Sequence, residues 1–338
     1  MTTDARAIEL ARPEIDGLTL RNYRLGDAAP MAELFNRVFE HDNVPWRTDP
    51  EEQANWLSAA NEHFDSARDV FIVEVEGVMV AHADTEWVDT TDGLREFRMG
   101  CLVDPAWRRR GIGTWLQRTM EAHIAEVAAA NPTDRPKAVG SWAADSEHDR
   151  IALLTRFGFQ PVRYFFEMVR PTLDEIEEPA LAEGLEIRPV SDGQMRQLWE
   201  ADIEAFRDHW GGFDGSEERF QQWMGDPKFD PSLFVIAWDG DEIAGGVINE
   251  INATENAAFN RQRGWLRSVF VRRPWRRRGV GKAIVLRSLQ VFRERGMTSA
   301  GLGVDADNPT GAMGLYTGTG FETEVRSTAY RKPMETAA

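Results

Sequence analysis

Two stretches of the sequence place three arginines directly before a G-x-G, WRRRGIG at 107–113 and WRRRGVG at 275–281. Each stretch follows an apolar run typical of a strand and leads into a run with helical spacing. The backbone N–H groups and the positive end of such a helix point at one place and favour an anion there. Glycine lets the backbone approach a ligand closely, and arginine can donate two hydrogen bonds to phosphate oxygens. These residues therefore suit the binding of a pyrophosphate group.

Other phosphate and metal motifs fit the sequence less well. The loop is not GxxxxGK[ST], because one residue separates Gly279 from Gly281, and it is not GxGxxG, because Ile284 stands at the third glycine position. The alternative is a basic helix start that binds nothing, but two copies of the loop, each after a strand, favour binding. The six histidines and the single Cys101 have no metal-ligand spacing, so we expect no metal.

The arginine loops belong to an internal repeat, which also includes three shorter matches in the same order. GLTLRNY (17–23) corresponds to GLEIRPV (184–190), VFIVEVEG (70–77) to LFVIAWDG (233–240), and TRFGF (155–159) to TGTGF (317–321). The chain of 338 residues is also longer than single cores usually grow. We therefore predict two domains of one fold, residues 15–171 and 183–334, joined by an acidic linker at 172–182.

The second copy shows how the loop is positioned. Its pattern predicts a short strand at 185–190, helices at 193–206 and 216–224, a hairpin turned at Asp239–Gly240–Asp241, a strand at 265–271, a helix at 279–296 and a strand at 298–304. A strand, a helix and a strand at this spacing indicate a right-handed parallel crossover. A helix beginning at Asn308 and a last strand near 326–333 complete the copy.

These motifs resemble those of the GNAT superfamily of N-acetyltransferases. The family pattern is a strand, P-x-x-R-x-x-G-x-G, a helix and a strand, followed by N-x-x-x-A-x-x-x-Y-x-x-x-G-F. The second copy has VFVRRPWRRRGVG and NPTGAMGLYTGTGF, with the proline one residue before Trp275 instead of two. The resemblance covers both halves, as in tandem GNAT proteins of the mycothiol synthase type. It implies an α/β (α+β) fold in each half: a mixed, mostly antiparallel sheet with a central parallel strand pair and flanking helices.

The resemblance also implies acetyl-CoA as co-substrate and assigns residues to it. Backbone atoms of Val269, Phe270 and Val271 would pair with the pantetheine arm, Arg276, Arg277, Arg278, Gly279, Val280, Gly281 and Lys282 would surround the pyrophosphate, and Asn308 and Ala312 would lie at the pantetheine end. The first-copy counterparts are Cys101, Leu102, Val103, Arg108, Arg109, Arg110, Gly111, Ile112 and Gly113. Asn308 followed by Pro309 is equally suited to begin a helix as its N-cap.

The implied reaction is attack of a neutral amine on the thioester, with the oxyanion held by a backbone N–H near Val271. Tyr316 would donate a proton to the departing thiolate; its alternative role is packing in the core. Aligned at the FGF and TGF stretches, the first copy has Leu154 in place of Tyr316 and Ser146 in place of Asn308. We therefore expect chemistry in the second copy only, whereas the first copy binds acetyl-CoA or keeps only the fold.

The general base and the amine acceptor are less defined. Many relatives carry a glutamate where this chain has Trp265, or Phe97 in the first copy, so Glu250 or an ordered water is the candidate base. The acceptor cleft of the fold falls at 205–213, where Asp208, His209 and Trp210 stand. A net charge of −17 and aromatic side chains favour a small cationic amine.

Composition excludes several other classes of protein. A net charge of −17 and a pI of about 4.9 disfavour nucleic acid and anionic membranes as partners. The start of the sequence has no apolar run typical of a signal or membrane segment, so we expect a cytoplasmic protein, monomeric or homodimeric. A non-catalytic acyl-CoA sensor is the alternative function, which would not need Tyr316.

Overall fold

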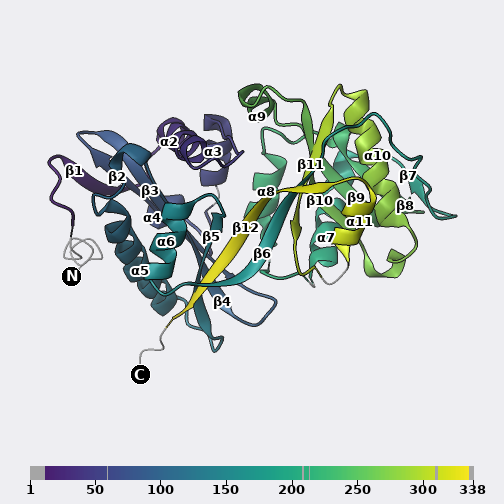
Figure 1. The fold of residues 1–338 in the computed structure, drawn as a ribbon. Coiled ribbons are helices and arrows are strands. Elements are labelled where there is room, and N and C mark those ends of the chain that lie inside the picture. The colour runs from purple at the N-terminus through teal and green to yellow at the C-terminus, as the bar shows by residue number, and fades with distance from the viewer. Residues whose placement is uncertain (1–11, 59, 208, 213, 309–310, 335–338) are drawn as a thin grey trace. The chain divides into compact units, whose positions relative to one another are not determined.

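The computed structural model describes residues 12–58, 60–207, 209–212, 214–308 and 311–334, which form two compact units (Figure 1). The first unit is drawn from Met1–Val162, Gly211–Pro227 and Thr328–Ala338, and the second from Arg163–Trp210 and Lys228–Ser327. Each unit therefore contains most of one copy of the repeat, and short segments of each copy belong to the other unit.

The first unit contains a mixed sheet. Its strands are, in order, β1 (Leu18–Asn22), β2 (Val70–Val75), β3 (Val78–Asp89), β4 (Arg95–Val103), β5 (Lys137–Ala144) and the end of β12 (Glu322–Pro333). Neighbours from β1 to β4 are antiparallel, while β4 and β5 are parallel and pair only from Arg95↔Lys137 to Arg98↔Gly140. Beyond Arg98 these two central strands separate, which opens a gap in the sheet.

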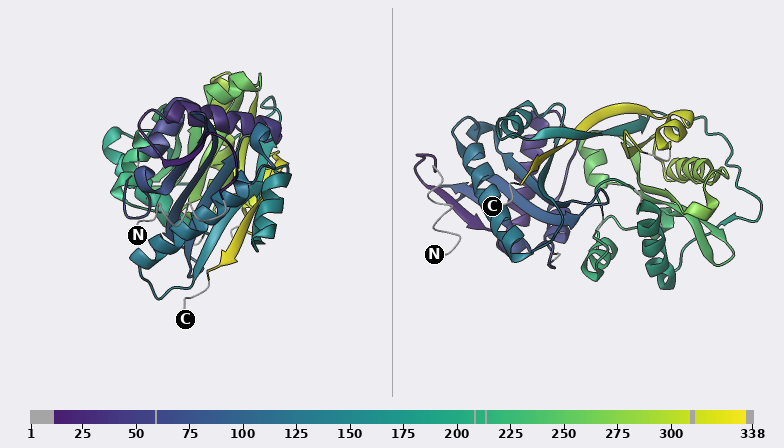
Figure 2. Two further views of the ribbon diagram at one scale, coloured as in Figure 1. Left: turned by 90° about the vertical axis from the view of Figure 1, so that its left-hand side faces the viewer. Right: turned by 90° about the horizontal axis from the view of Figure 1, so that it is seen from below.

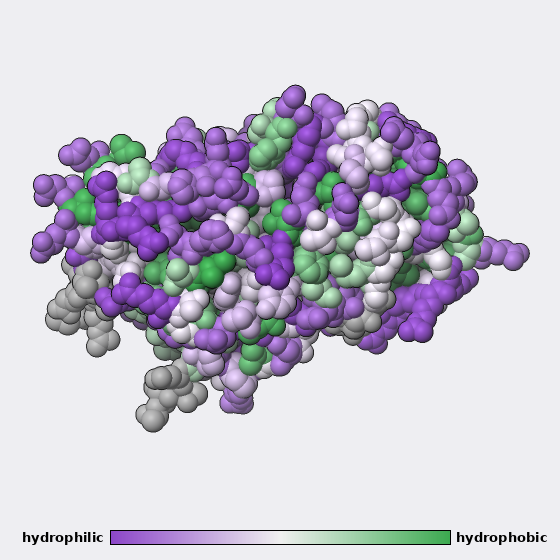
Figure 3. All heavy atoms as spheres, viewed as in Figure 1, coloured by the Kyte–Doolittle hydropathy of each residue, from purple (hydrophilic) through white to green (hydrophobic). Residues whose placement is uncertain are grey.

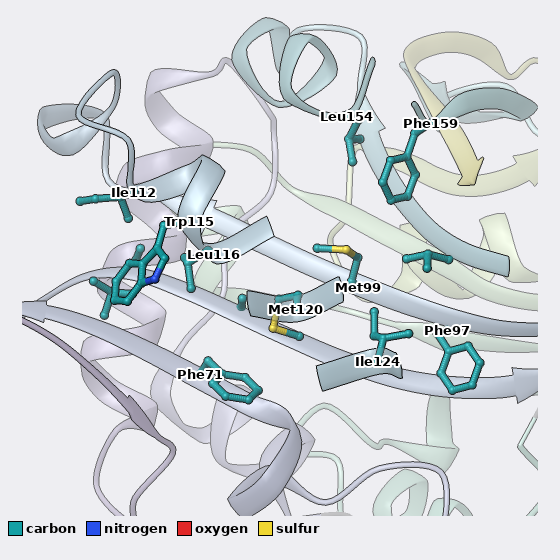
Figure 4. Packing of buried hydrophobic residues seen from close by; sticks show 14 of the residues in the cluster. Phe71, Phe97, Met99, Ile112, Trp115, Leu116, Met120, Ile124, Leu154 and Phe159 are labelled. Carbon is teal, nitrogen blue, oxygen red and sulfur yellow. The ribbon is translucent and has the colours of Figure 1, made fainter. Parts of the chain in front are cut away.

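Helices cover both faces of this sheet because strand residues alternate between the faces. They are α2 (Ala28–His41), α3 (Pro50–Leu57), α4 (Ser66–Asp69), α5 (Ile112–Ala130), α6 (His148–Arg156) and α8 (Glu217–Met224). On β2, Val73 packs in the cluster that includes α5, whereas Ile72 packs in the cluster that includes α2. Figure 4 shows Trp115, Leu116 and Met120 of α5 within the first of these clusters, and Figure 2 shows the helices from two further sides.

The second unit repeats this architecture. Its sheet has the order β7 (Glu186–Ile187), β8 (Val235–Asp239), β9 (Glu242–Glu250), β10 (Arg263–Val271), β11 (Ser299–Asp305) and β6 (Gln160–Arg170, from Arg163 onward). Only β10 and β11 are parallel among the pairs with a described register, and they pair from Arg263↔Ser299 to Leu266↔Leu302. The mixed sheet with a central parallel pair that the sequence predicts is therefore confirmed.

The helices of the second unit are α7 (Met195–Phe206), α9 (Ala253–Ala258), α10 (Val280–Glu294) and α11 (Ala312–Gly318). The predicted helix start at Asn308 is wrong, because α11 begins at Ala312 with Gly311 as its N-cap, and the Asn308 carbonyl instead accepts the Gly311 N–H at 3.3 Å. Pro309 lies outside the described residues. The hairpin at Gly240 and the N-cap at Ser216 agree with the sequence.

The two units differ from the predicted domain boundaries at four segments, one of which is 328–334, predicted in the second domain but part of the first unit. The part of β6 from Arg163 belongs to the second unit, where it pairs with β11. The segment 211–227 carries α8 into the first unit, where the Gln222 side chain donates to the Asn55 and Trp56 carbonyls at 2.9 Å. The predicted linker packs on the second unit through Leu173, whose N–H donates to the Thr298 carbonyl at 3.1 Å.

The surface is mainly hydrophilic on the face drawn in Figure 3, with smaller hydrophobic areas between. This distribution agrees with a chain in which charged residues make up 28% of the sequence and carry a strong acidic excess. None of the helices in the described ranges has the length and apolar character needed to cross a bilayer.

Candidate functional site

The two arginine loops adopt the same backbone conformation. In each, the strand β4 or β10 ends in a short 3-10 turn, and the loop then enters α5 or α10. The helix is preceded by a glycine in the left-handed region, Gly111 at φ 88° or Gly279 at φ 78°. The second arginine of each loop is left-handed as well, with φ 61° at Arg109 and 59° at Arg277. Such alternation turns successive N–H groups inward and forms a concave anion site at the helix start.

The first arginine of each loop is bound to the protein itself. Arg108 donates from Nε to the Val103 carbonyl at 3.1 Å, and Arg276 donates in the same way to the Val271 carbonyl at 2.9 Å. Arg108 also makes two bonds of 2.7 Å to the Asp42 carboxylate. These two arginines therefore fasten the loop to its strand, and the arginines that follow are more available to a ligand.

The following arginines differ between the copies. Arg109 forms an ion pair of 2.5 Å with Asp149, and the Arg110 guanidinium lies 4.6 Å from the centre of the Trp107 ring. Arg277 and Arg278 are exposed and form no ion pair within the described part of the chain. Lys282, in the first turn of α10, donates to Glu177 at 2.8 Å, and both side chains are largely exposed. The second loop thus offers more unpaired positive charge to phosphate.

A cavity of about 390 Å³ lies in the first unit between its loop, β4 and α6. The first-copy residues predicted to contact acetyl-CoA line it as a group: Cys101, Leu102, Val103, Arg108, Arg109, Gly111 and Gly113. Of the remaining two, Ile112 is buried in the core below the loop and Arg110 stacks on Trp107. Folding has therefore brought these predicted residues to one cleft.

The strand predicted to pair with pantetheine is β10 in the second unit. Its pairing with β9 shifts between Leu266 and Ser268, and its pairing with β11 ends at Leu266. Val269 and Val271 face the core that contains α10 and α11, so their neighbours Ser268 and Phe270 point to the opposite face. The strand thus runs beside an opening in the sheet, from the bulge at Ser268 to the loop at Arg276.

Tyr316 and Leu154 occupy corresponding places in the two units. Tyr316 is buried in the core cluster of the second unit, with its ring 6.1 Å from that of Phe321, and Ala312 packs against the same cluster. Burial raises the pKa of the Tyr316 phenol above its ordinary value. Leu154 lies in the first unit's core beside Phe159 (Figure 4). Packing accounts for the burial of Tyr316, and its catalytic role stays a prediction.

The structure separates the candidates for the base. Trp265, at the position of the family's glutamate, is buried and donates its indole N–H to Glu255 at 2.9 Å. Glu250 accepts two hydrogen bonds of 2.8 Å from Arg267, so its negative charge is paired with that guanidinium. Sequence reasoning missed Asp202 of α7, whose Oδ1 accepts a hydrogen bond of 2.6 Å from the Ser268 hydroxyl at the bulge. Burial raises the pKa of Asp202 to about 6, against the opposing effect of that hydrogen bond.

The predicted acceptor residues follow α7. The His209 N–H donates to the Phe206 carbonyl at 2.9 Å, and the two rings lie 4.3 Å apart. Trp210 packs on Phe165 at 6.0 Å, while Asp208 lies outside the described residues. In the described ranges, no group of three or more His, Cys, Asp or Glu side chains is placed to hold a metal ion.

Comparison with known proteins follows the same division into two copies. The sequence matches the acetyltransferase (GNAT) family over residues 29–159 and again over 195–321. It is 27% identical to a mycothiol acetyltransferase of Geodermatophilus obscurus over 270 residues, 78% of this chain and 82% of the relative. It is 30% identical to that of Frankia casuarinae (strain DSM 45818 / CECT 9043 / HFP020203 / CcI3) over 241 residues, 68% and 66% of the two chains.

Two solved structures share the fold over nearly the whole chain. A GCN5-related N-acetyltransferase from Sphaerobacter thermophilus superposes with a TM-score of 0.69 at 26% identity, covering 96% of this chain and 98% of its own. A tandem GNAT protein from the clavulanic acid biosynthesis pathway also gives 0.69, at 15% identity, covering 95% and 100%. The second likeness concerns the fold alone.

Proposed function

Since the chain belongs to the acetyltransferase (GNAT) family and is an acyltransferase with two tandem copies of that fold, we propose that its second unit moves the acetyl group of acetyl-CoA to a primary amine of a small molecule. Acetyl-CoA is the co-substrate of the family. The amine acceptor and the assignment to the second unit are the new parts of this proposal.

The observation that carries the proposal is the half-buried hydrogen bond between Ser268 and Asp202. It lies at the bulge of β10, one residue before the strand Val269–Val271 that would pair with pantetheine. The acetyl group is attached at the far end of pantetheine from the pyrophosphate, so it would reach this end of the strand when the phosphates lie at Arg277 and Arg278. A carboxylate held there can accept a proton from an attacking amine.

The proposed reaction uses both faces of β10. Asp202 approaches from the α7 face and takes a proton from the neutral amine as its nitrogen attacks the thioester carbon; it later releases that proton to solvent. A backbone N–H of β10 beside the bulge would hold the oxyanion, at the opposite end of the strand from the predicted position near Val271. When the C–S bond breaks, Tyr316 on the α11 face gives its proton to the thiolate and regains one from solvent. Because burial raises its pKa, the phenol is protonated before the reaction.

The acceptor is proposed to be a small cationic amine. The acidic excess of the chain attracts cations, and the aromatic rings of His209 and Trp210 follow α7, the helix that carries Asp202. The relatives are mycothiol acetyltransferases, so their acceptor is the first amine to compare with amino sugars, polyamines and amino acid esters.

Release of free thiol from acetyl-CoA tests the proposal. The full chain is mixed with acetyl-CoA and, in separate reactions, with glucosamine, spermidine, an amino acid methyl ester or the acceptor of the mycothiol acetyltransferases. We expect thiol release that depends on one of these amines. The Arg277→Glu/Arg278→Glu variant should lose it and remain folded, because both side chains are exposed and form no ion pair with a described residue. Acetyl-CoA binding without turnover of any amine would favour the sensor function instead.

A further inference from the structure

The two units differ at the first turn of the helix that carries Leu154 or Tyr316. The first unit has Asp149 and Arg150 there, and the second unit has Gly311 and Ala312 at the same distances before Leu154 and Tyr316. Two charged side chains in one copy thus replace a hydrogen atom and a methyl group in the other. In the first unit, both residues line the cavity beside the arginine loop.

In the first unit, the Arg150 side chain crosses the gap between the central parallel strands at one side of the cavity. Its Nη1 donates to the Cys101 carbonyl of β4 at 2.6 Å, and its Nη2 donates to the Ser141 hydroxyl of β5 at 3.0 Å. Ser141, only 2% exposed, in turn donates to the Met99 carbonyl at 2.9 Å. The guanidinium therefore bridges the strands just after they separate, and it uses a strand carbonyl that a pantetheine amide would need.

Asp149 acts on the other end of the same cleft. Its carboxylate lies 2.5 Å from Arg109 and 3.6 Å from Arg108, the two arginines of the loop that line the cavity. A phosphate group at this loop would have to compete with a carboxylate that is covalently part of the protein. The protein groups that would bind the phosphates and the pantetheine arm of a coenzyme are thus already bonded to side chains of the first unit.

The second unit leaves the corresponding positions open. Gly303, the counterpart of Ser141, is exposed, and a Cβ atom added to it would meet no atom of the described residues within 4 Å. The same holds for Gly311, the counterpart of Asp149. Ala312 has only a methyl group where the first unit has the guanidinium of Arg150, and Arg277 forms no ion pair within the described residues.

We propose that Asp149 and Arg150 close the first unit to acyl-coenzyme A, so that the chain binds one acetyl-CoA, in the second unit. Arg150 occupies the track of the pantetheine arm, and Asp149 occupies the phosphate loop. The number of sites rests on the proposed function, because it assumes that the second unit binds acetyl-CoA. The closure of the first unit does not rest on it.

Titration calorimetry of the full chain with coenzyme A tests the inference. Wild-type protein should bind one equivalent, and the Asp149→Gly/Arg150→Ala variant, which copies the second unit, should bind two. Arg156→Ala is the matched control, because Arg156 is an exposed arginine of the same helix that also lines the cavity, and it should leave one site. Adding Arg277→Glu/Arg278→Glu assigns the sites: it should remove the only site of wild type and one of two in the opened variant.

The outcomes separate this inference from the proposed function. Two equivalents bound by wild type would overturn the closure, even if the opened variant failed to fold. The closure would also be overturned if wild type and the opened variant each bound one equivalent and the two proteins melted at the same temperature. No binding to wild type together with one site in the opened variant would uphold the closure and contradict binding by the second unit.

Discussion

At the scale of single residues, the three arginines of each loop do different jobs. Arg108 and Arg276 hold the carbonyl group of the residue at the end of the strand, so their loss would disturb the loop before it disturbed any ligand. Arg277 and Arg278 are exposed and make no such bond among the described residues. Three identical residues therefore have different roles: the first arginine holds the loop in place, and the next two are available to bind a phosphate.

Tyr316→Phe should lower kcat by about 10²- to 10⁴-fold, the range for one positioned acid, with the KM for acetyl-CoA unchanged. The ring that packs in the core is kept, so the free energy of unfolding in urea should not change. Steady-state thiol release checks the rate. A variant with the wild-type kcat would show that Tyr316 serves packing only.

Residue spacing predicted the loops and the tyrosine position, but it could not identify Asp202. Acidic residues are common in this chain, and nothing in the letters of α7 distinguishes Asp202 from Glu200 or Glu204. Only the packing of α7 on β10 brings Asp202 to Ser268 and Glu204 to Arg272, where Glu204 accepts at 2.8 Å. Because the tertiary contact alone distinguishes Asp202, the local sequence could not identify it as a candidate base.

At the scale of elements, most strands and the long helices follow the hydrophobic pattern, although the strand predicted at 185–190 is only Glu186–Ile187. The pattern failed at α11, which has glycines at 311, 314 and 318. Glycine destabilises a helix interior by about 1 kcal/mol relative to alanine, so a helix this rich in glycine does not extend back to Asn308. Instead, Gly311 takes a left-handed conformation at φ 76° and begins a helix of seven residues.

The contact between α7 and β10 predicts a pH dependence. Because the pKa of Asp202 is raised to about 6, the carboxylate is protonated below that pH, and the rate of a base-dependent step should fall as pH decreases through 6. Asp202→Asn should lower kcat by about 10²- to 10⁴-fold and remove this acidic limb. The pH profile of kcat provides the measurement.

Glu204→Gln is the matched control for Asp202, because it lies on the same helix and pairs with Arg272 away from the bulge. It should keep both the rate and the acidic limb. If Asp202→Asn kept the limb as well, another group would be the base, and the Asp202–Ser268 bond would only join the helix to the strand.

At the scale of the whole molecule, each compact unit is built from segments that are not contiguous in the sequence. The repeat in the sequence correctly implied two copies of one fold, but it could not show which strand completes which sheet. Strand edges pair through backbone groups that every residue except proline carries, so the exchange has no signature in residue type. The boundaries at 171 and 183 therefore divide the sequence but not the compact units.

The exchange predicts an effect of the C-terminal strand on the first unit. Tyr330 is 7% exposed and packs in the first unit's core. Tyr330→Ala should lower the free energy of unfolding of that unit by about 3–5 kcal/mol, the usual cost of removing a buried aromatic side chain. Hydrogen exchange should become faster in β4, β5 and α5, which mass spectrometry of peptides can locate.

Lys332→Ala is the control, because Lys332 pairs with Glu121 at 3.0 Å but stays partly exposed. A pair of this kind contributes about 0–1 kcal/mol. If Tyr330→Ala accelerated exchange only in the second unit, the assignment of the last strand to the first unit would be incorrect.

The position of Tyr330 also sets the timing of folding during synthesis. The first unit needs residues from Thr328 onward, although all its other residues have been translated by position 227. At roughly 5–20 residues per second, a ribosome takes on the order of 5–20 seconds to add the intervening segment. During that interval, the edge of β5 is not yet paired with β12, its neighbour in the folded sheet. The nascent chain therefore keeps this strand edge open to mispairing until β12 has been synthesised.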